Sequence, residues 1–262
     1  MLQQRLLVAA AGIPLLALLL ALPDPAFAAI AIVLLAYAAF EFVRAVAPDA
    51  SLPWPLSAGV VAALLVALAR TSAEFPVAWL LAPTVGAIGL LLWSWNALGD
   101  GMGGWWVGGV LYVGVPGAHL VLARNLEDGQ GWLVVLLAIV FATDTGAYVA
   151  GRVLGRHKLA PAISPNKTVE GAIGGLLAGA GAAVVTPGLA HAGITLLGMA
   201  LLALVVPLAA MAGDLVESAL KRRMGVKDMS SLLPGHGGLV DRLDSILAAG
   251  PCLYWIVRWL QT

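Results

Sequence analysis

Charged residues are scarce in this chain of 262 residues. Only 11% of the residues are charged, whereas 61% are hydrophobic, and the mean hydropathy is +0.97. Soluble domains usually carry about 25% charged residues, so the composition excludes an ordinary soluble domain. The formal net charge is zero, and we expect no nucleic-acid partner. The chain has one cysteine, Cys252, which excludes an intramolecular disulfide.

Long apolar runs separate the few charges. About 20 apolar residues in a helix cross roughly 30 Å of hydrocarbon. We therefore predict an all-α, polytopic integral membrane protein with about nine transmembrane helices. We expect a single integral domain over residues 1–262, with N-terminal helices to about residue 130 and catalytic helices and cytoplasmic loops over 131–262. The predicted spans are 5–22, 26–43, 52–69, 76–94, 105–123, 132–150, 171–189, 193–213 and 243–260.

The first span has a second interpretation. Arg5, the apolar run to Leu22 and a small-residue stretch over 26–28 resemble a cleaved signal peptide. The run is long for such a peptide, and Pro23-Asp24-Pro25 is equally typical of a tight turn between two spans. We expect the first span to be retained as a helix.

The basic residues predict the orientation of the chain. With the N-terminus in the cytoplasm, only Arg70, Arg124 and Arg258 of the 14 Lys and Arg residues fall outside. The two strongly charged loops, 151–170 and 214–244, then lie on the cytoplasmic side. Cleavage of the first span would not change the sidedness of these later loops. We therefore expect a polar cavity that faces the cytoplasm.

The first charged loop follows the predicted span 132–150, which carries an acidic residue, Asp144, in its last part. An ionised carboxylate at membrane depth needs a partner, so Asp144 is either an interfacial side chain or part of the polar cavity. Pro165 disfavours helix at Ser164, and a new helix is expected to begin near 166–168, where its amides favour an anion. The basic residues are either phosphate ligands or ordinary cytoplasmic topology signals; they are Arg152, Arg156, Lys158 and Lys167.

The second charged loop joins two helix ends that carry carboxylates. Asp241 and Asp244, three residues apart, share a face near the start of the last span. Oxygen ligands of this kind suit Mg²⁺, which takes carboxylates together with waters and substrate phosphates. At the end of the preceding span, a spacing of 0, +3, +4 and +7 places four residues on one helix face: Asp214, Glu217, Ser218 and Lys221.

A glycine-rich segment lies between these two helix ends. Gly235, Gly237 and Gly238 let backbone amides approach an anion closely. His236 is either a phosphate contact or proton carrier, or a donor that fixes the loop. The concentration of carboxylates, cations and glycines in one stretch favours a site over a solvated charged loop.

The residues of this stretch resemble a known motif. The pattern is Ser218-x-Leu220-Lys221-Arg222, then Lys227-Asp228, then Leu233-Pro234-Gly235-His236-Gly237-Gly238-Leu239-x-Asp241-Arg242-Leu243-Asp244. It is similar to the motif of the phosphatidate cytidylyltransferases, or CDP-diacylglycerol synthases, without a departure. The segment 144–171 is also similar to a second polar region of that family. The resemblance covers the C-terminal half well, and the N-terminal spans only as generic hydrophobic helices.

The resemblance implies the transfer of a cytidylyl group from CTP to phosphatidate, giving CDP-diacylglycerol and pyrophosphate. It implies Mg²⁺, with K⁺ as a second ion, at the cytoplasmic face of the cell inner membrane among membrane lipids. By motif position, Asp214 and Asp241 are the expected metal ligands, with Asp144 and Asp244 as further ligands or supporting groups. The expected catalytic residues are Asp214, Lys221, Arg222, Lys227, Asp241, Arg242 and Asp244. The expected substrate-binding residues are Asp144, Arg152, Lys158, Ser164, Lys167, Ser218, Gly235, His236, Gly237 and Gly238.

Three alternatives stay open at this point. A transporter or flippase also has Gly-rich helices and an intramembrane acid, although here the charges gather on one side. A CTP-dependent polyprenol kinase would release CDP instead of pyrophosphate. A non-catalytic scaffold leaves the paired carboxylates unexplained. The oligomeric state is open, and a homodimer is one option.

Overall fold

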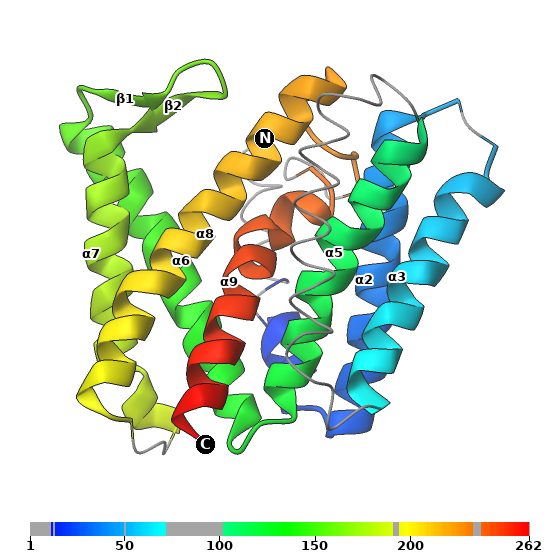
Figure 1. Ribbon diagram of the computed structural model, residues 1–262. Helices are drawn as coiled ribbons and strands as arrows, with labels where there is room; N and C mark the ends of the chain where they lie inside the picture. The colour runs from blue at the N-terminus through cyan, green and yellow to red at the C-terminus, as the bar shows by residue number, and fades with distance from the viewer. Residues whose placement is uncertain are drawn as a thin grey trace. The chain divides into compact units, whose positions relative to one another are not determined.

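The computed structural model describes residues 12, 14–49, 51–71, 102–190, 194–232 and 237–261 (Figure 1). The chain divides into two compact units. Unit 1 comprises Met1–Leu122 and Asp228–Arg242, and unit 2 comprises Ala123–Lys227 and Leu243–Thr262. Two of the three chain boundaries between the units fall inside helices, one in α5 (Met102–Arg124) and one in the last helix, α9 (Val240–Leu260). The expectation of one integral domain stays a prediction.

Among its described residues, unit 1 contains three long apolar helices and the segment that leads into α9. Small residues bring the helices together: a Cβ on Gly59 of α3 would lie 2.7 Å from the carbonyl oxygen of Ala36 in α2. A Cβ on Gly117 of α5 would lie 2.6 Å from Leu35. In a membrane the hydrophobic effect does not drive helices together, because lipid tails are as apolar as the side chains. Close backbone approach at small residues is therefore typical of helix packing there. The helices are α2 (Asp24–Val46), α3 (Pro53–Thr71) and α5 (Met102–Arg124), the last two residues of which belong to unit 2.

Unit 2 places a small hairpin at one end of a helical layer. The helices α6 and α7 approach closely, because a Cβ on Gly146 of α6 would lie 2.5 Å from Ala178 and 2.7 Å from the carbonyl oxygen of Gly174, both in α7. Glycine and alanine thus let α6 and α7 pack with little side-chain volume between them. Besides the C-terminal part of α9, the elements are α6 (Gly129–Leu154), β1 (Lys158–Ala160), β2 (Ser164–Thr168), α7 (Val169–Val185), a 3-10 turn (Pro187–Ala190) and α8 (Leu196–Met224).

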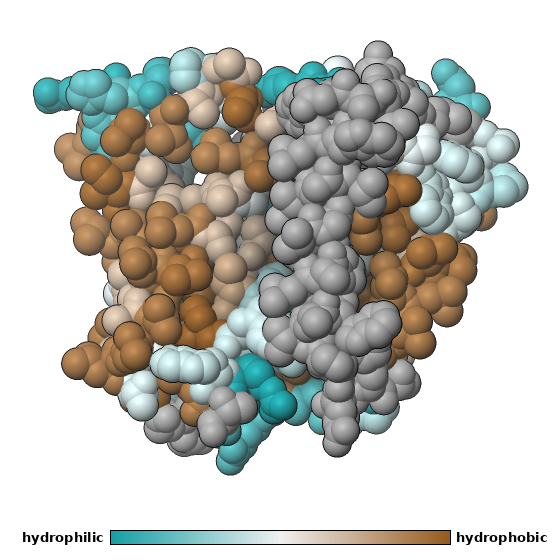
Figure 2. Space-filling view, viewed as in Figure 1, coloured by the Kyte–Doolittle hydropathy of each residue, from teal (hydrophilic) through white to brown (hydrophobic). Residues whose placement is uncertain are grey.

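The all-α polytopic membrane fold is confirmed. Among the described residues, five helices are long and apolar enough to cross a membrane: α2, α3, α5, α6 and α8. Each coincides with a predicted span. Figure 2 shows hydrophobic residues over α7 and α8, and hydrophilic ones at the end with the hairpin.

The remaining four predicted spans are not confirmed as spans. The span 76–94 lies outside the described residues, and so do residues 5–11 and 13 of the span 5–22, of which 14–21 are helical. The stretch predicted as 171–189 forms α7, a shorter apolar helix of 17 residues. The stretch 243–260 forms most of α9, whose first turn carries Asp241. About nine spans therefore stays a prediction.

The first charged loop contains a hairpin that the sequence did not predict. Strands β1 and β2 pair antiparallel, with Lys158 opposite Thr168 and Ala160 opposite Ser164. The helix expected near 166–168 begins at Val169, because Thr168 stays extended and caps it, its Oγ1 accepting the N–H of Gly171 at 3.1 Å. The expected helix start was therefore correct to within a few residues, and the extended chain before it is a hairpin.

Candidate functional site

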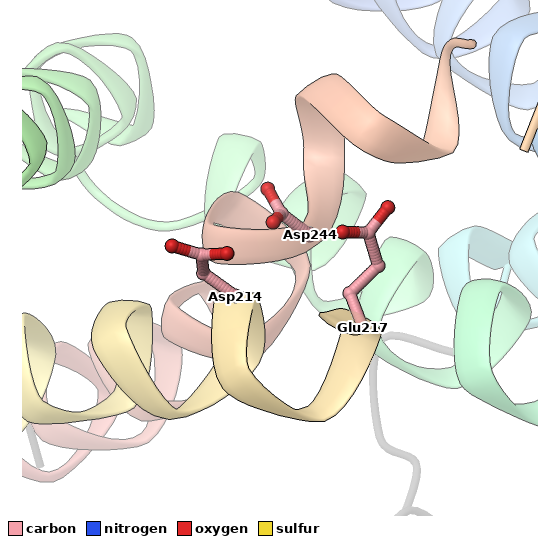
Figure 3. Close-up of side chains that lie close together, drawn as sticks. All are labelled: Asp214, Glu217 and Asp244. Carbon is pink, nitrogen blue, oxygen red and sulfur yellow. The ribbon is translucent and has the colours of Figure 1, made fainter. Parts of the chain in front are cut away.

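Three carboxylates gather in unit 2. Asp214 and Glu217 come from α8 and Asp244 from α9, and one oxygen of each lies within 4.8 Å of the others (Figure 3). Glu217 is 1% exposed and Asp244 is 9% exposed, so two of the three are withdrawn from solvent. An all-oxygen donor set of this kind fits Mg²⁺. We call these three residues the carboxylate cluster.

The cluster forms because α8 and α9 approach at a glycine. A Cβ on Gly213 would lie 2.6 Å from the Cβ of Ala248 and 2.6 Å from the carbonyl oxygen of Asp244. Only a residue without a side chain lets α8 lie this close to α9, and this residue directly precedes Asp214. The carboxylate of Asp244 is oriented in turn by the N–H of Ser245, which donates to Oδ1 at 2.7 Å. Local sequence thus determines how the two helix faces meet.

Two lysines neutralise part of the cluster. The Nζ of Lys167, on β2, lies 2.7 Å from Oδ2 of Asp214, and the Nζ of Lys221 lies 2.6 Å from Oε2 of Glu217. Lys221 and Glu217 are one helical turn apart on α8. Carboxylates this close repel one another unless cations compensate. A metal ion would therefore compete with the ammonium groups for the carboxylates, and a phosphate would compete with the carboxylates for the ammonium groups.

The hairpin that carries Lys167 is attached at two points. At the start of α7, the Glu170 carboxylate accepts the backbone N–H of Arg156 at 3.1 Å and lies 2.6 Å from Nδ1 of His157. The hydrogen bond with His157, followed by that with the Arg156 amide, lowers the pKa of Glu170 from 4.5 to about 2. At the other end, Nε of Arg222 on α8 donates to the carbonyl oxygen of Ile163 at 3.3 Å. Both attachments lie within unit 2 and hold Lys167 beside Asp214.

In unit 1, Asp241 organises the described part of the glycine-rich segment. Its Oδ2 accepts the N–H of Met229 at 2.9 Å and that of Gly238 at 2.7 Å. Gly237 has φ +78°, a left-handed conformation that favours glycine. At least one oxygen of Asp241 therefore bonds backbone amides. Since Asp241 belongs to unit 1 and Asp214 to unit 2, their pairing as metal ligands stays a prediction.

Sequence reasoning missed two acidic residues. Glu217 was placed on the correct helix face but was not named as a ligand. Glu41, in α2, was passed over with the N-terminal spans, yet its buried carboxylate accepts Oγ–H of Ser230 at 2.5 Å and N–H of Val240 at 2.8 Å. An available signal was a carboxylate inside an apolar run, which needs partners.

The other predicted site residues are distributed over both units. Ser218 is half-buried on α8, and Ser164 is half-buried in β2. Arg152 donates from Nη1 to the hydroxyl of Tyr148 at 2.6 Å, one turn earlier on α6. Gly235 and His236 lie outside the described residues. Exposed positions are Asp144, Lys158, Arg222, Lys227 and Arg242.

Known proteins match this chain along most of its length. A family model described as "Cytidylyltransferase family" matches residues 3–260. A phosphatidate cytidylyltransferase of Brucella melitensis is 46% identical over 156 residues, which are 58% of this chain and 56% of that protein. The enzyme of that name from Staphylococcus haemolyticus is 41% identical over 144 residues, 55% of each chain. That from Bacillus subtilis is 40% identical over 148 residues, 56% of this chain and 55% of that protein.

These alignments span about half the length of the curated relatives, 55% or 56% in each case. The family model, in contrast, covers both units and every residue of the carboxylate cluster. The match over residues 3–260 shows that the chain belongs to the cytidylyltransferase family.

Proposed function

We propose that this protein transfers a cytidylyl group from CTP to phosphatidate, giving CDP-diacylglycerol and pyrophosphate. The observation that carries the proposal is the carboxylate cluster, in which one oxygen each of Asp214 and Glu217 on α8 and of Asp244 on α9 lie within 4.8 Å of one another. Relatives named phosphatidate cytidylyltransferase, 40% to 46% identical over the aligned residues, support the choice of substrates.

The reaction needs alignment and charge neutralisation more than proton transfer. A phosphate oxygen of phosphatidate, already anionic at neutral pH, attacks the α-phosphorus of CTP. A new P–O bond forms there, the bond to the bridging oxygen of the β-phosphate breaks, and pyrophosphate leaves with that oxygen. Lys167 and Lys221 lie beside the cluster, and we propose that they hold phosphate oxygens and compensate their charge.

We propose that the carboxylate cluster holds Mg²⁺ through Asp214, Glu217 and Asp244. The donor set consists of carboxylate oxygens, which are the ligands that Mg²⁺ prefers. When bound, the ion would neutralise nucleotide phosphates. Asp241, with K⁺ as a second ion, remains a further proposal from the resemblance.

We also propose the cell inner membrane as the location, with the cluster toward the cytoplasm. The support is the excess of Lys and Arg in loops 151–170 and 214–244. Basic groups at that surface would attract both an anionic lipid headgroup and a nucleotide.

The test is a product analysis of the purified, membrane-reconstituted protein. Phosphatidate, Mg²⁺ and each nucleoside triphosphate are supplied in turn, and pyrophosphate and lipid-linked cytidine are measured together. We expect equal amounts of both products with CTP. Release of CDP with a phosphorylated lipid would instead establish the kinase alternative, and lipid movement into sealed vesicles without CTP consumption would establish a transporter.

A further inference from the structure

Glu41 is a buried carboxylate in the apolar helix α2, far in sequence from every residue of the motif. Its exposed fraction is 2%, and its hydrogen-bond partners Ser230 and Val240 are 189 and 199 positions away. We propose that Glu41 is a positioning residue of the proposed enzyme: it fixes Ser230, Gly238 and Val240 within the described stretches 229–232 and 237–241, which together we call the segment. This role rests on the proposed function for its effect on turnover, but not for its effect on the segment.

The contacts of Glu41 lie on both sides of the undescribed residues 233–236. Oε1 accepts from Oγ of Ser230 at 2.5 Å, and Oε2 accepts from the backbone N–H of Val240 at 2.8 Å. A Cβ on Gly238 would lie 2.5 Å from both carboxylate oxygens. The carboxylate therefore takes the space that the glycine leaves, and it contacts the segment at three positions.

A second carboxylate acts on neighbouring positions of the same segment. Asp241 accepts the amides of Met229 and Gly238, while Glu41 accepts from Ser230 and Val240. Bonds to an ionised acceptor are shorter and stronger than neutral ones. The two acids together hold four positions, and the N-terminal helices supply one of the two.

The contact between Glu41 and Val240 affects the start of α9. Val240 is the first residue of α9, where backbone N–H groups have no partner within the helix. A carboxylate there satisfies an N–H and interacts favourably with the helix dipole. Because Asp241 and Arg242 follow directly, Glu41 determines where these two motif residues begin their helix.

Burial of an acid in an apolar helix is unfavourable without compensating hydrogen bonds. The side-chain hydrogen bonds of Glu41 with Ser230 and Val240 both go to the segment. The contacts thus distinguish a residue that organises the segment from one that merely fills the core of unit 1.

The experiment compares four variants in reconstituted membranes. Glu41→Ala removes both acceptors, whereas Glu41→Gln keeps the size of the side chain, one acceptor for Val240 N–H and a donor that Ser230 Oγ can accept. Ser230→Ala removes one contact only. Asp49→Asn, an exposed carboxylate after the end of α2, is the matched control. Amide hydrogen exchange is read at 229–232 and 237–241, and kcat and KM for CTP are measured separately.

We expect Glu41→Ala to raise exchange in those two stretches and to lower kcat about 10-fold, as for a misplaced reacting group, with KM changed less than about twofold. Glu41→Gln should restore most of the lost turnover, Ser230→Ala should give a smaller loss, and Asp49→Asn none. Unchanged exchange and turnover in Glu41→Ala would overturn the proposal. So would exchange raised equally throughout unit 1 in both Glu41→Ala and Ser230→Ala. Wild-type protein without transferase activity would refute the proposed function alone, since the exchange measurement still decides the role of Glu41.

Discussion

The two units use carboxylates in different ways. In unit 2, Asp214 and Glu217 are paired with the ammonium ends of Lys167 and Lys221. In unit 1, Glu41 and Asp241 accept backbone amides and a serine hydroxyl at fixed positions. A lysine side chain can rotate away when a metal ion or phosphate arrives, but a backbone amide cannot.

The carboxylates of the two units are therefore suited to two different tasks. The carboxylates of unit 2 are suited to exchange one cation for another, which a metal site requires. Those of unit 1 are suited to hold a chain segment in place, which a glycine-rich segment requires because glycine loses the most conformational freedom on ordering. Substitutions in unit 2 should therefore weaken metal binding, and substitutions in unit 1 should loosen the segment.

The largest expected effect is that of Asp214→Asn. It removes a charged member of the carboxylate cluster while keeping its shape, so turnover should fall at least about 10²-fold, as for loss of a central electrostatic group. Thermal unfolding without added metal should change little, because Asp214 is 38% exposed. Steady-state assays and unfolding curves check both, with Asp49→Asn as the control. Near-normal turnover would remove Asp214 from the site.

A smaller effect is expected at the approach of α8 and α9. Gly213→Ala places a Cβ 2.6 Å from Ala248 and from the Asp244 carbonyl oxygen, so the helices must separate. We expect a loss of about 1–3 kcal/mol in the free energy of unfolding and about 10-fold in turnover. Gly181→Ala is the matched control, since nothing lies within 4 Å of its Cβ. Equal behaviour of the two variants would contradict the role given to Gly213.

Lys167→Met should have a modest effect of opposite sign on metal binding. Removal of the ammonium beside Asp214 relieves repulsion of a divalent cation. Because both side chains are partly exposed, solvent screening limits the gain in affinity to about threefold. Mn²⁺ titration followed by electron paramagnetic resonance measures it, while turnover should fall through loss of a phosphate contact. Weaker Mn²⁺ binding would mean that Lys167 organises the cluster instead of competing for it.

The smallest effect concerns the attachment of the hairpin and depends on pH. The pKa of Glu170 is lowered from 4.5 to about 2, so its contribution to stability is fully present above pH 4.5. It is lost as the pH falls through about 2, when the folded form also becomes protonated. The difference in melting temperature between wild type and Glu170→Gln should shrink as the pH falls from about 4.5 toward 2. Glu127→Gln, an exposed carboxylate, should show no such pattern.

Much of the carboxylate cluster could be predicted from spacing, whereas the segment contacts could not. The interval of three residues places Asp214 and Glu217 on one face of α8, and the same interval marked Asp244 as a candidate. The close approach of α8 and α9 depends on Gly213. The role of this glycine cannot be seen in the sequence, because it depends on contacts with Asp244 and Ala248 in α9.

Other features depend on contacts between distant parts of the chain. Glu41 and Val240 are 199 positions apart, and no local pattern connects them. The hairpin consists of strands of three and five residues, which are too short to show a period of their own. Long apolar helices, in contrast, carry their signal in composition, and five of them were correctly predicted.

The most direct test of the carboxylate cluster is Mn²⁺ binding to the purified protein in lipid nanodiscs, without nucleotide. Electron paramagnetic resonance would compare wild type with Asp214→Asn, Glu217→Gln, Asp244→Asn and the Asp49→Asn control. We predict a wild-type site whose affinity falls at least about 10-fold, or 1.4 kcal/mol, in each cluster variant and stays unchanged in the control. Equal affinity in all five proteins would contradict a metal site at these carboxylates.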